Sequence, residues 1–342
     1  MRLNRVAFMI RLLVLVLAPV SAHAQLLGTV QQLSFIGPVT GRPVNFSIYV
    51  PQGYSTSIDR VPVIYHLHGL EGAHNSQQIS AVPASYEAAR AAGLIGPAII
   101  VFPDAYGNSF WADSARTIKP AETNIIRELI PYIDANYRTQ AHRGGRAITG
   151  FSMGGFSTPM YLAKFPEIFS VSVQYDGSMA NWTQMRTIRP DIAAEIYDNS
   201  ETRFNTYSPW RWTQENASIL IASSAMRILV GGEASSPSSN RAFRDHLLSL
   251  GINPQYIETG LPHNLPLFLQ NYGAGSWAFI QNNLSGPGCP ADFNGDGNVD
   301  GDDIIAFFAA WDQASPSADT NADGSVDGDD VIALFDRWDS GC

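Results

Sequence analysis

The sequence of 342 residues is poor in cysteine, in basic charge and in long apolar runs. Lysine and arginine together number 21 against 31 acidic residues, so a basic surface of the kind that binds nucleic acid is not expected. Beyond the first 24 residues, no apolar run is long enough to span a bilayer as a helix. The length exceeds what one ordinary domain needs, and the hydrophobic fraction of 45% is enough for a sizeable core.

The N-terminus has the features of a secretory signal peptide. Arginines at positions 2, 5 and 11 precede an apolar run at residues 12–20, and Ala22-His23-Ala24 supplies a small-x-small cleavage site. The apolar run is too short for a membrane-spanning helix. We therefore expect residues 1–24 to be removed by cleavage after Ala24, which leaves a soluble, secreted protein.

The acidic charge is concentrated near the C-terminus. From Cys289 to Cys342 there are 13 aspartates, no glutamate and one basic residue, Arg337, which gives −12 against −10 for the whole chain. The rest of the chain is therefore close to neutral. The only two cysteines bracket this segment, and in an exported protein they predict a disulfide between Cys289 and Cys342. Catalytic or metal-binding cysteines are disfavoured because the segment contains no histidine.

The acidic segment contains the same twelve-residue pattern twice. DFNGDGNVDGDD spans Asp292–Asp303 and DTNADGSVDGDD spans Asp319–Asp330. Each copy has carboxylate or amide oxygens at positions one, three, five, nine and twelve and a glycine at position six, which is the spacing of a calcium-binding loop. An apolar helix-like run follows each loop, which disfavours the alternative of a disordered acidic tail.

Two acidic loop–helix units at the end of an exported chain resemble a type I dockerin, over Ala291 to Asp339. The resemblance implies two calcium ions and a cohesin-bearing or other surface partner. Partner-reading positions ten and eleven are Gly301-Asp302 and Gly328-Asp329 here, in place of small hydroxyl residues, so a self-contained appendage is the alternative. The implied ligands, with backbone carbonyls at position seven, are Asp292, Asn294, Asp296, Asn298, Asp300 and Asp303 in the first loop and Asp319, Asn321, Asp323, Ser325, Asp327 and Asp330 in the second.

The stretch AITGFSMGGFS, at residues 147–157, places Ser152 between glycines directly after a β-branched run. Gly150 to Gly154 form a Gly-x-Ser-x-Gly pattern, which is typical of a nucleophile elbow, where a strand ends in a sharp turn and a helix begins. The alternative is a glycine-rich turn whose serine caps a helix. A strand-like run before Ser152 and a helix-like run after it favour the elbow.

Between residues 25 and 285, short β-like runs alternate with helix-like stretches. This order predicts an α/β domain with a mainly parallel sheet covered by helices. Residues 286–290 form a short linker to a small all-α module at 291–342. The expected strands lie at 44–50, 61–69, 98–107, 146–152, 169–177, 226–233 and 254–260, and the expected helices lie at 122–137 with a kink at Pro131, at 153–166 and at 240–251.

A serine nucleophile needs a base, and the base needs an acid that orients it. Only His246 and His263 follow Ser152. His263 is the expected base because it lies in the loop after the last strand, near the sheet edge to which an elbow points, whereas His246 lies within a helix. Glu233, at the end of an expected strand, is the expected acid, and Asp176, at the end of the preceding strand, is the reserve candidate.

The oxyanion that forms during acyl transfer needs two backbone N–H donors. We expect these from Met153, directly after the nucleophile, and from Leu70, in the loop after YHLHG. His66 and His68 lie on one face of a strand, which permits a metal site, but no third ligand with suitable spacing is apparent. His68 is therefore expected to hydrogen-bond around the loop and to support the oxyanion hole.

Five segments together resemble the putative esterase group of the α/β-hydrolases, over most of Gly28–Leu284: YHLHGLEG, VFPDAYGNSFWADS, TNIIRELIPYIDANYRT, AITGFSMGGFSTPMYLAKFPEIF and PHN. This group includes feruloyl and acetylxylan esterases of carbohydrate esterase family one, S-formylglutathione hydrolases and secreted mycolyltransferases. The resemblance implies an α/β-hydrolase fold with Ser152 as nucleophile, His263 as base and Leu70 as an oxyanion donor. The acid departs from the common pattern, which has an aspartate where this chain has Ala234.

The residues and the resemblance together predict a secreted serine carboxylic-ester hydrolase. It is expected to remove feruloyl or acetyl groups from polysaccharides through an acyl-enzyme on Ser152, with no cofactor for catalysis. One alternative is a polyester or lipid esterase, or an acyltransferase, that uses the same residues. Another is a binding protein whose hydrolase fold has no catalytic activity. Four tryptophans in loop-like regions either stack on sugar or aromatic acyl groups or pack in the core: Trp111, Trp182, Trp210 and Trp212.

Overall fold

The computed structural model describes residues 26–116, 118–232, 236–284, 291–294, 299–321 and 323–340. The expected signal peptide, the linker and the two cysteines of the expected disulfide, Cys289 and Cys342, lie outside these residues.

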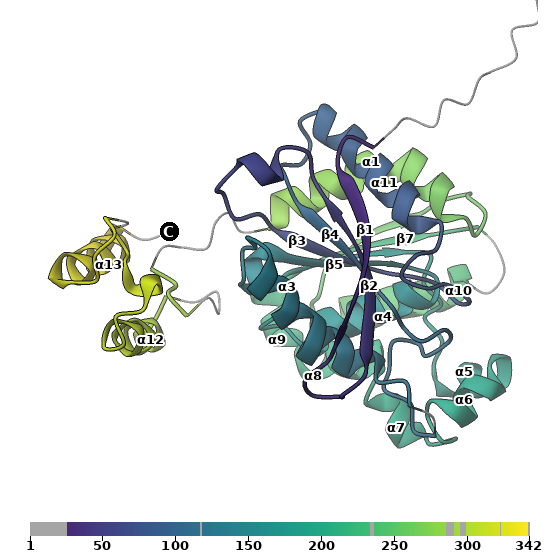
Figure 1. Ribbon diagram of the computed structural model, residues 1–342. Coiled ribbons are helices and arrows are strands. Elements are labelled where there is room, and N and C mark those ends of the chain that lie inside the picture. The colour runs from purple at the N-terminus through teal and green to yellow at the C-terminus, as the bar shows by residue number, and fades with distance from the viewer. Residues whose placement is uncertain are drawn as a thin grey trace, which may run out of the picture.

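Eight strands form one sheet in the order β1-β2-β4-β3-β5-β6-β7-β8 (Figure 1). All neighbours from β4 to β8 are parallel, while β1 and β2 form an antiparallel edge. The prediction of a mainly parallel sheet is therefore confirmed. The strands are β1 (Thr29–Ile36), β2 (Pro43–Val50), β3 (Val63–Leu67), β4 (Ile99–Pro103), β5 (Arg146–Phe151), β6 (Val171–Tyr175), β7 (Ala225–Val230) and β8 (Gln255–Glu258).

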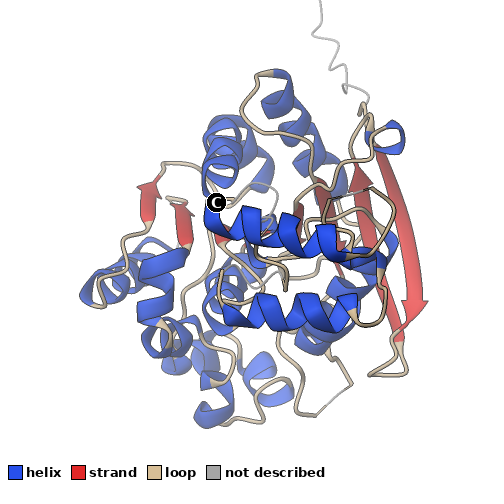
Figure 2. Ribbon diagram, turned by 90° about the vertical axis from the view of Figure 1, so that its left-hand side faces the viewer, coloured by secondary structure: helices blue, strands red, loops and turns tan. Residues whose placement is uncertain are grey.

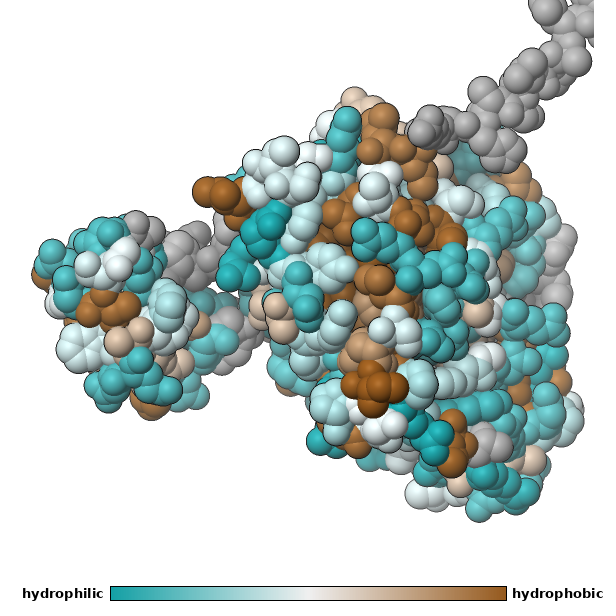
Figure 3. Space-filling view, in the orientation of Figure 1, coloured by the Kyte–Doolittle hydropathy of each residue, from teal (hydrophilic) through white to brown (hydrophobic). Residues whose placement is uncertain are grey.

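Strand β1 was not expected from the sequence. Its apolar residues do not alternate regularly because Gln31 and Gln32 interrupt the pattern, and Leu33 and Phe35 are only partly buried. Along this edge of the sheet, apolar side chains are interspersed with polar ones on the surface, as Figure 3 shows.

Helices cover both faces of the sheet. On one face α1 (Gln78–Ala91) and α11 (Leu265–Asn283) lie side by side and bury Tyr86, Phe268 and Trp277 against the strands. The other face is covered by residues 124–136, by α4 (Met153–Lys164) and by α10 (Ser236–Ser249), which contribute Ile133, Met160 and Phe243 to a second core. Both faces of the strands are consequently buried, as is usual for parallel sheets.

The helix expected at 122–137 is divided into three parts. A short α2 (Ala121–Thr123) leads into a π-helical turn (Asn124–Leu129), and α3 (Ile130–Asn136) follows. Pro131 lies in the first turn of α3, directly after the π-helical turn. The expected kink at Pro131 therefore falls at a change of helix type.

Between β6 and β7 the chain forms a helical insertion that was not expected from the sequence. Its helix starts nevertheless carry sequence signals. Asn181 and Gln184 form a capping box, Ser200 caps another helix, and Pro190 and Pro209 each begin one. The helices are α5 (Trp182–Ile188), α6 (Pro190–Glu195), α7 (Glu201–Asn205), α8 (Pro209–Glu215) and α9 (Ala217–Ser223).

The C-terminal segment contains two helices, α12 (Gly301–Trp311) and α13 (Gly328–Ser340). They lie side by side in Figures 1 and 2 and share a small core made by Phe307, Ala318 and Leu334. Among the described residues, no helix combines the length and the apolar character that crossing a membrane requires.

Candidate active site

Ser152 occupies a sharp turn between β5 and α4. Its φ of 57° and ψ of −114° are strained for a residue with a side chain, at a cost of about 1–3 kcal/mol. The turn brings α4 so close to β3 that a Cβ at Gly154 would overlap the carbonyl oxygen of Leu67. This close approach explains why glycine follows the serine by two positions, and it places the hydroxyl at the carboxyl edge of the sheet.

Three side chains from distant parts of the chain form one hydrogen-bonded series. The Ser152 hydroxyl lies 2.9 Å from Nε2 of His263, and Nδ1 of His263 lies 2.5 Å from a carboxylate oxygen of Asp176. A carboxylate only accepts, so Nδ1 carries the imidazole proton and donates to Asp176. Nε2 is then free to accept the serine proton. The ring of Phe151 packs on the imidazole at a centroid distance of 4.5 Å.

The carboxylate beside His263 is therefore that of Asp176, the reserve candidate, and not that of Glu233. Asp176 directly follows β6 and its side chain is 1% exposed. Its second oxygen accepts the backbone N–H of Gly231 at 2.8 Å. Asp176 thus occupies the position facing Nδ1 that had been assigned to Glu233, which lies outside the described residues.

The two expected oxyanion donors flank the serine. Met153 begins α4 directly after Ser152, and Leu70 lines the same cleft as Ser152. The loop that carries Leu70 passes close to the serine, since a Cβ on Gly69 would lie 3.1 Å from the Cβ of Ser152.

His66, in β3, and His68, directly after β3, both hydrogen-bond to other groups of the protein. Nδ1 of His66 lies 2.8 Å from the hydroxyl of Thr149, and burial lowers the pKa of His66 to about 3. His68 bonds the carbonyl of Gly69 through Nδ1 at 2.8 Å, and its Nε2 accepts the N–H of Ala105 at 3.2 Å. Burial also lowers the pKa of His68, which keeps it neutral. The expected hydrogen bonding of His68 around the loop is confirmed.

The other histidine that follows Ser152 lies away from the serine. Nε2 of His246 is 3.1 Å from both the Thr213 hydroxyl and the Trp210 carbonyl, and its ring packs against Trp210. Trp111 is fully buried and Trp182 nearly so, so both pack in the core and neither forms a stacking surface for substrate.

A cleft of about 940 Å³ opens over Ser152 and His263. Its walls come from the loop after β3, the start of α1, the start of α11 and the α5–α6 junction. The residues that line it besides the serine and histidine are His68, Gly69, Leu70, Glu71, Gly72, Ser76, Gln77, Gln78, Ala81, Phe151, Arg189, Asn264, Leu265, Pro266 and Leu267.

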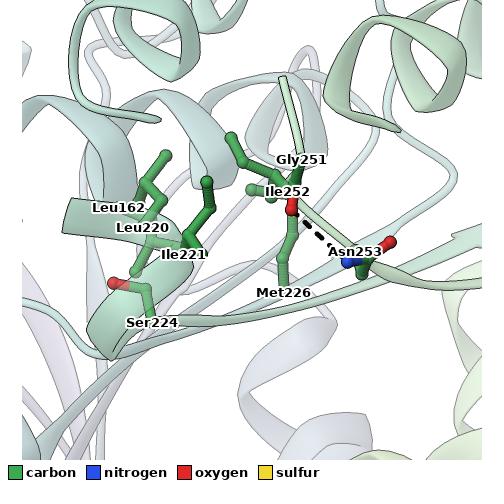
Figure 4. Close-up of a pocket in the computed structure, with 8 residues that line it drawn as sticks. All are labelled: Leu162, Leu220, Ile221, Ser224, Met226, Gly251, Ile252 and Asn253. Atoms are coloured by element: carbon green, nitrogen blue, oxygen red, sulfur yellow. Dashed lines mark hydrogen bonds between the residues drawn. The ribbon is translucent and has the colours of Figure 1, made fainter. Parts of the chain in front are cut away.

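A second hollow, of about 130 Å³, lies near the starts of β7 and β8, at the sheet edge opposite to Ser152 (Figure 4). None of the described residues that line it has an acidic, basic or imidazole side chain. Its lining residues are Leu162, Leu220, Ile221, Ser224, Met226, Gly251, Ile252 and Asn253.

Residues 37–230, which include Ser152 and Asp176, match the family described as "Putative esterase". The chain belongs to this family. Over 165 residues, or 46% of its length, it is 32% identical to an endo-1,4-β-xylanase/feruloyl esterase of Xylanibacter ruminicola, of which it spans only 22%.

Solved structures agree in fold. A ferulic acid esterase superposes with a TM-score of 0.64 at 20% identity, covering 75% of this chain and 98% of that one. An S-formylglutathione hydrolase from Agrobacterium tumefaciens superposes with a TM-score of 0.63 at 16% identity, covering 76% and 97%. The likeness establishes an α/β-hydrolase-like fold.

The two acidic loops near the C-terminus, Asp292–Asp303 and Asp319–Asp330, have matching hydrogen bonds. The buried carboxylate of Asp303 accepts the backbone N–H groups of Asn294 and Asp300, each at 2.9 Å. At the same positions in the second loop, the buried carboxylate of Asp330 accepts those of Asn321 at 3.1 Å and Asp327 at 2.9 Å. Positions three, nine and twelve are thus joined in the same way in both loops.

Other implied calcium ligands are partly described. In the second loop Gly324, at position six, has a φ of 91°, and Asp319 and Asn321 accept N–H groups from within the loop. In the first loop, Asp296 and Asn298 lie outside the described residues. Over the part of the chain that the structure describes, no three His, Cys, Asp or Glu side chains converge on one point.

Proposed function

We propose that the protein is a secreted serine carboxylic-ester hydrolase that removes feruloyl or acetyl groups from polysaccharides. The observation that carries this proposal is the hydrogen-bonded series from Asp176 through His263 to Ser152 at the base of an open cleft. This arrangement has the geometry of an activated serine nucleophile.

In the proposed mechanism, the Ser152 hydroxyl attacks the ester carbonyl carbon while Nε2 of His263 takes its proton. The backbone N–H groups of Met153 and Leu70 stabilise the negative oxygen of the tetrahedral intermediate. The C–O bond to the alcohol then breaks, and His263 protonates the leaving oxygen. A water molecule, deprotonated by His263, attacks the acyl-enzyme. The bond to the serine oxygen then breaks, His263 returns the proton to that oxygen, and the carboxylic acid leaves. Asp176 holds the imidazole in orientation and stabilises its protonated form.

The substrate class is proposed from the relatives and from the cleft. The Xylanibacter relative is described as a xylanase and feruloyl esterase, and a ferulic acid esterase shares the fold. The cleft is open and has exposed amide side chains at Gln77 and Asn264 on its walls, which suits hydrogen bonding to sugar hydroxyls. Polyester or lipid esters would react at the same serine, and a substrate panel separates these classes.

The test compares the mature protein with Ser152→Ala. Turnover of 4-nitrophenyl acetate and methyl ferulate should fall by at least about 10³-fold in the variant, since the nucleophile is absent. Ser80→Ala, which removes an exposed hydroxyl from α1, is the matched control and should retain activity. Equal turnover by the wild type and Ser152→Ala would refute the proposal, and failure of a fluorophosphonate to label Ser152 would favour a binding protein without activity.

For the C-terminal module we propose that each loop binds one calcium ion and that the module attaches the enzyme to a cohesin-bearing or other surface partner. The matching hydrogen bonds at Asp303 and Asp330 support two equivalent loops. When bound, calcium would supply a rigid charged centre for each loop. The carboxylate and amide oxygens of Asp292, Asn294, Asp300, Asp319, Asn321, Asp323 and Asp327 would hold it with the twelfth-position aspartates, together with Asp296 and Asn298 of the first loop and the Ser325 carbonyl of the second.

A further inference from the structure

The loop that follows β4, over residues 104–111, contacts both elements that carry the expected oxyanion donors. Three non-glycine residues of this loop have positive φ angles: Tyr106 (54°), Phe110 (52°) and Trp111 (59°). Such strain persists only where the surrounding structure holds it, and it is common at functional sites.

One contact is made by Asn108 beside Leu70. The carbonyl of Gly69 accepts the N–H of Gly72 at 3.2 Å, so Leu70 and Glu71 are the central residues of a four-residue turn. Glu71 has a φ of 60°, in the region that normally requires glycine. Its backbone N–H donates to the side-chain oxygen of Asn108 at 2.7 Å. This bond holds the peptide that follows Leu70 in its strained orientation.

Two further bonds hold the start of the same turn. The indole N–H of Trp111 donates to the carbonyl of His68 at 3.1 Å, and the N–H of Ala105 donates to the His68 ring. The Trp111 and His68 rings are in contact, with centroids 4.7 Å apart. The turn is therefore bonded to this loop before Leu70 and after it.

The same loop also contacts α4 next to the serine. The N–H of Phe110 points to the sulfur of Met153 at 3.3 Å, and the Ser157 hydroxyl donates to the Phe110 carbonyl at 2.9 Å. One short loop thus links Leu70 and Met153, whose N–H groups must converge on one oxygen atom.

We propose that Asn108 is a positioning residue, which holds the Leu70–Glu71 turn so that the Leu70 N–H points at the developing oxyanion. This inference rests on the proposed function of Ser152. Asn108 is not part of the hydrogen-bonded series at His263, and its side chain acts through the backbone of Glu71. Removing it should move one oxyanion donor without removing the donor.

The experiment uses Asn108→Leu, which keeps the side-chain size but lacks an acceptor, and Asn108→Asp, which keeps one. Asn75→Leu is the matched control, because Asn75 is exposed and, among the described residues, its side chain makes a single 3.4 Å bond, to Gln32. Turnover of 4-nitrophenyl acetate is measured together with the rate at which a fluorophosphonate labels Ser152. In that labelling the serine oxygen bonds to phosphorus, fluoride leaves, His263 takes the proton, and the phosphoryl oxygen occupies the oxyanion position.

We expect Asn108→Leu to lower both kcat and the labelling rate by about 10- to 100-fold, less than the 10²–10³ that follows loss of a donor itself. KM should stay within about twofold, since the interaction strengthens only in the transition state. Asn108→Asp should recover more than half of the loss on a logarithmic scale, with the remainder due to its added negative charge.

A structural role would show instead as a lowered melting temperature with no recovery by Asn108→Asp, and that result overturns the inference. Labelling of Asn108→Leu at the wild-type rate, or a loss confined to KM, overturns it as well. If Asn108→Leu does not fold, Asn108→Ala is measured in its place. Wild-type protein that is labelled on Ser152 but hydrolyses no ester in the panel refutes the proposed function alone, because the labelling rates still decide the role of Asn108.

Discussion

Replacing Asp176 by asparagine tests which acid orients the base. In the folded protein one oxygen of Asp176 faces the N–H of His263 and the other accepts the N–H of Gly231, so both oxygens serve as acceptors. An asparagine has only one acceptor oxygen, and its NH₂ group must face one of the two donors. If the NH₂ group faces His263, the imidazole proton must move to Nε2, which can then no longer accept the serine proton. If the NH₂ group faces Gly231, the bond to the Gly231 N–H is lost.

The size of the effect follows from the position of the carboxylate. Asp176 is 1% exposed, so water cannot replace the lost acceptor. In serine hydrolases the same change lowers kcat by about 10⁴-fold, because the base then has its proton on the nitrogen that must accept the serine hydrogen. We expect a comparable loss for Asp176→Asn, with KM changed only slightly.

The assay is steady-state hydrolysis of 4-nitrophenyl acetate, with circular dichroism to confirm folding. Glu233→Gln is the comparison variant and should lose less than about tenfold, since the position facing His263 is filled by Asp176. If Glu233→Gln loses its hydrolytic activity while Asp176→Asn keeps it, Asp176 is refuted as the acid and Glu233 takes that role.

Three further predictions concern stability. Burial raises the pKa of Glu122 to about 7 despite the Lys164 ammonium 2.7 Å away. Because the unfolded chain would release this proton near 4.5, the unfolding free energy should fall by at most about 3 kcal/mol as the pH rises from about 4.5 to 7, and Glu122→Gln should flatten that part of a urea-unfolding profile. Gly154→Ala should force α4 away from Leu67, lowering the unfolding free energy by about 1–3 kcal/mol and also the activity; a variant of unchanged stability and activity would contradict the close approach. Chelation of calcium should lower the melting temperature of the C-terminal module and leave that of the sheet domain unchanged, because calcium at a thousand times Kd adds about 4 kcal/mol to the unfolding free energy of the module that binds it. Asp330→Asn should reduce this calcium-dependent shift in melting temperature. If the wild-type protein shows no shift, the calcium proposal is refuted.

The sequence was informative where a local pattern determines the structure. The Gly-x-Ser-x-Gly pattern predicted the turn at Ser152, because only glycine at position 154 lets α4 approach β3. The position of His263 was predictable because the carboxyl ends of parallel strands meet at one edge of the sheet. Both conclusions needed only the order of the elements and the side-chain volume at particular positions.

The helices between β6 and β7 were harder to predict. Each of α5 to α9 has at most seven residues, which is too short for an apolar periodicity to stand out. Their starts are marked by Asn181, Ser200 and the prolines at 190 and 209, so capping residues were the usable signal. Strand β1 was missed for a related reason, since its glutamines break the alternation.

The carboxylate beside His263 was expected from Glu233 and belongs to Asp176, because two neighbouring strands offer a carboxylate at the same sheet edge. Strand order alone does not decide between Asp176 after β6 and Glu233 after β7. The deciding residue is Gly231, the first after β7, whose N–H bonds one oxygen of Asp176 and whose missing Cβ makes room for the other: a Cβ there would lie 2.7 Å from that oxygen. The missing side chain of Gly231, the first glycine in VGGE, thus leaves the space into which the Asp176 carboxylate fits, and a small residue directly after one strand points to the strand beside it as the source of the carboxylate.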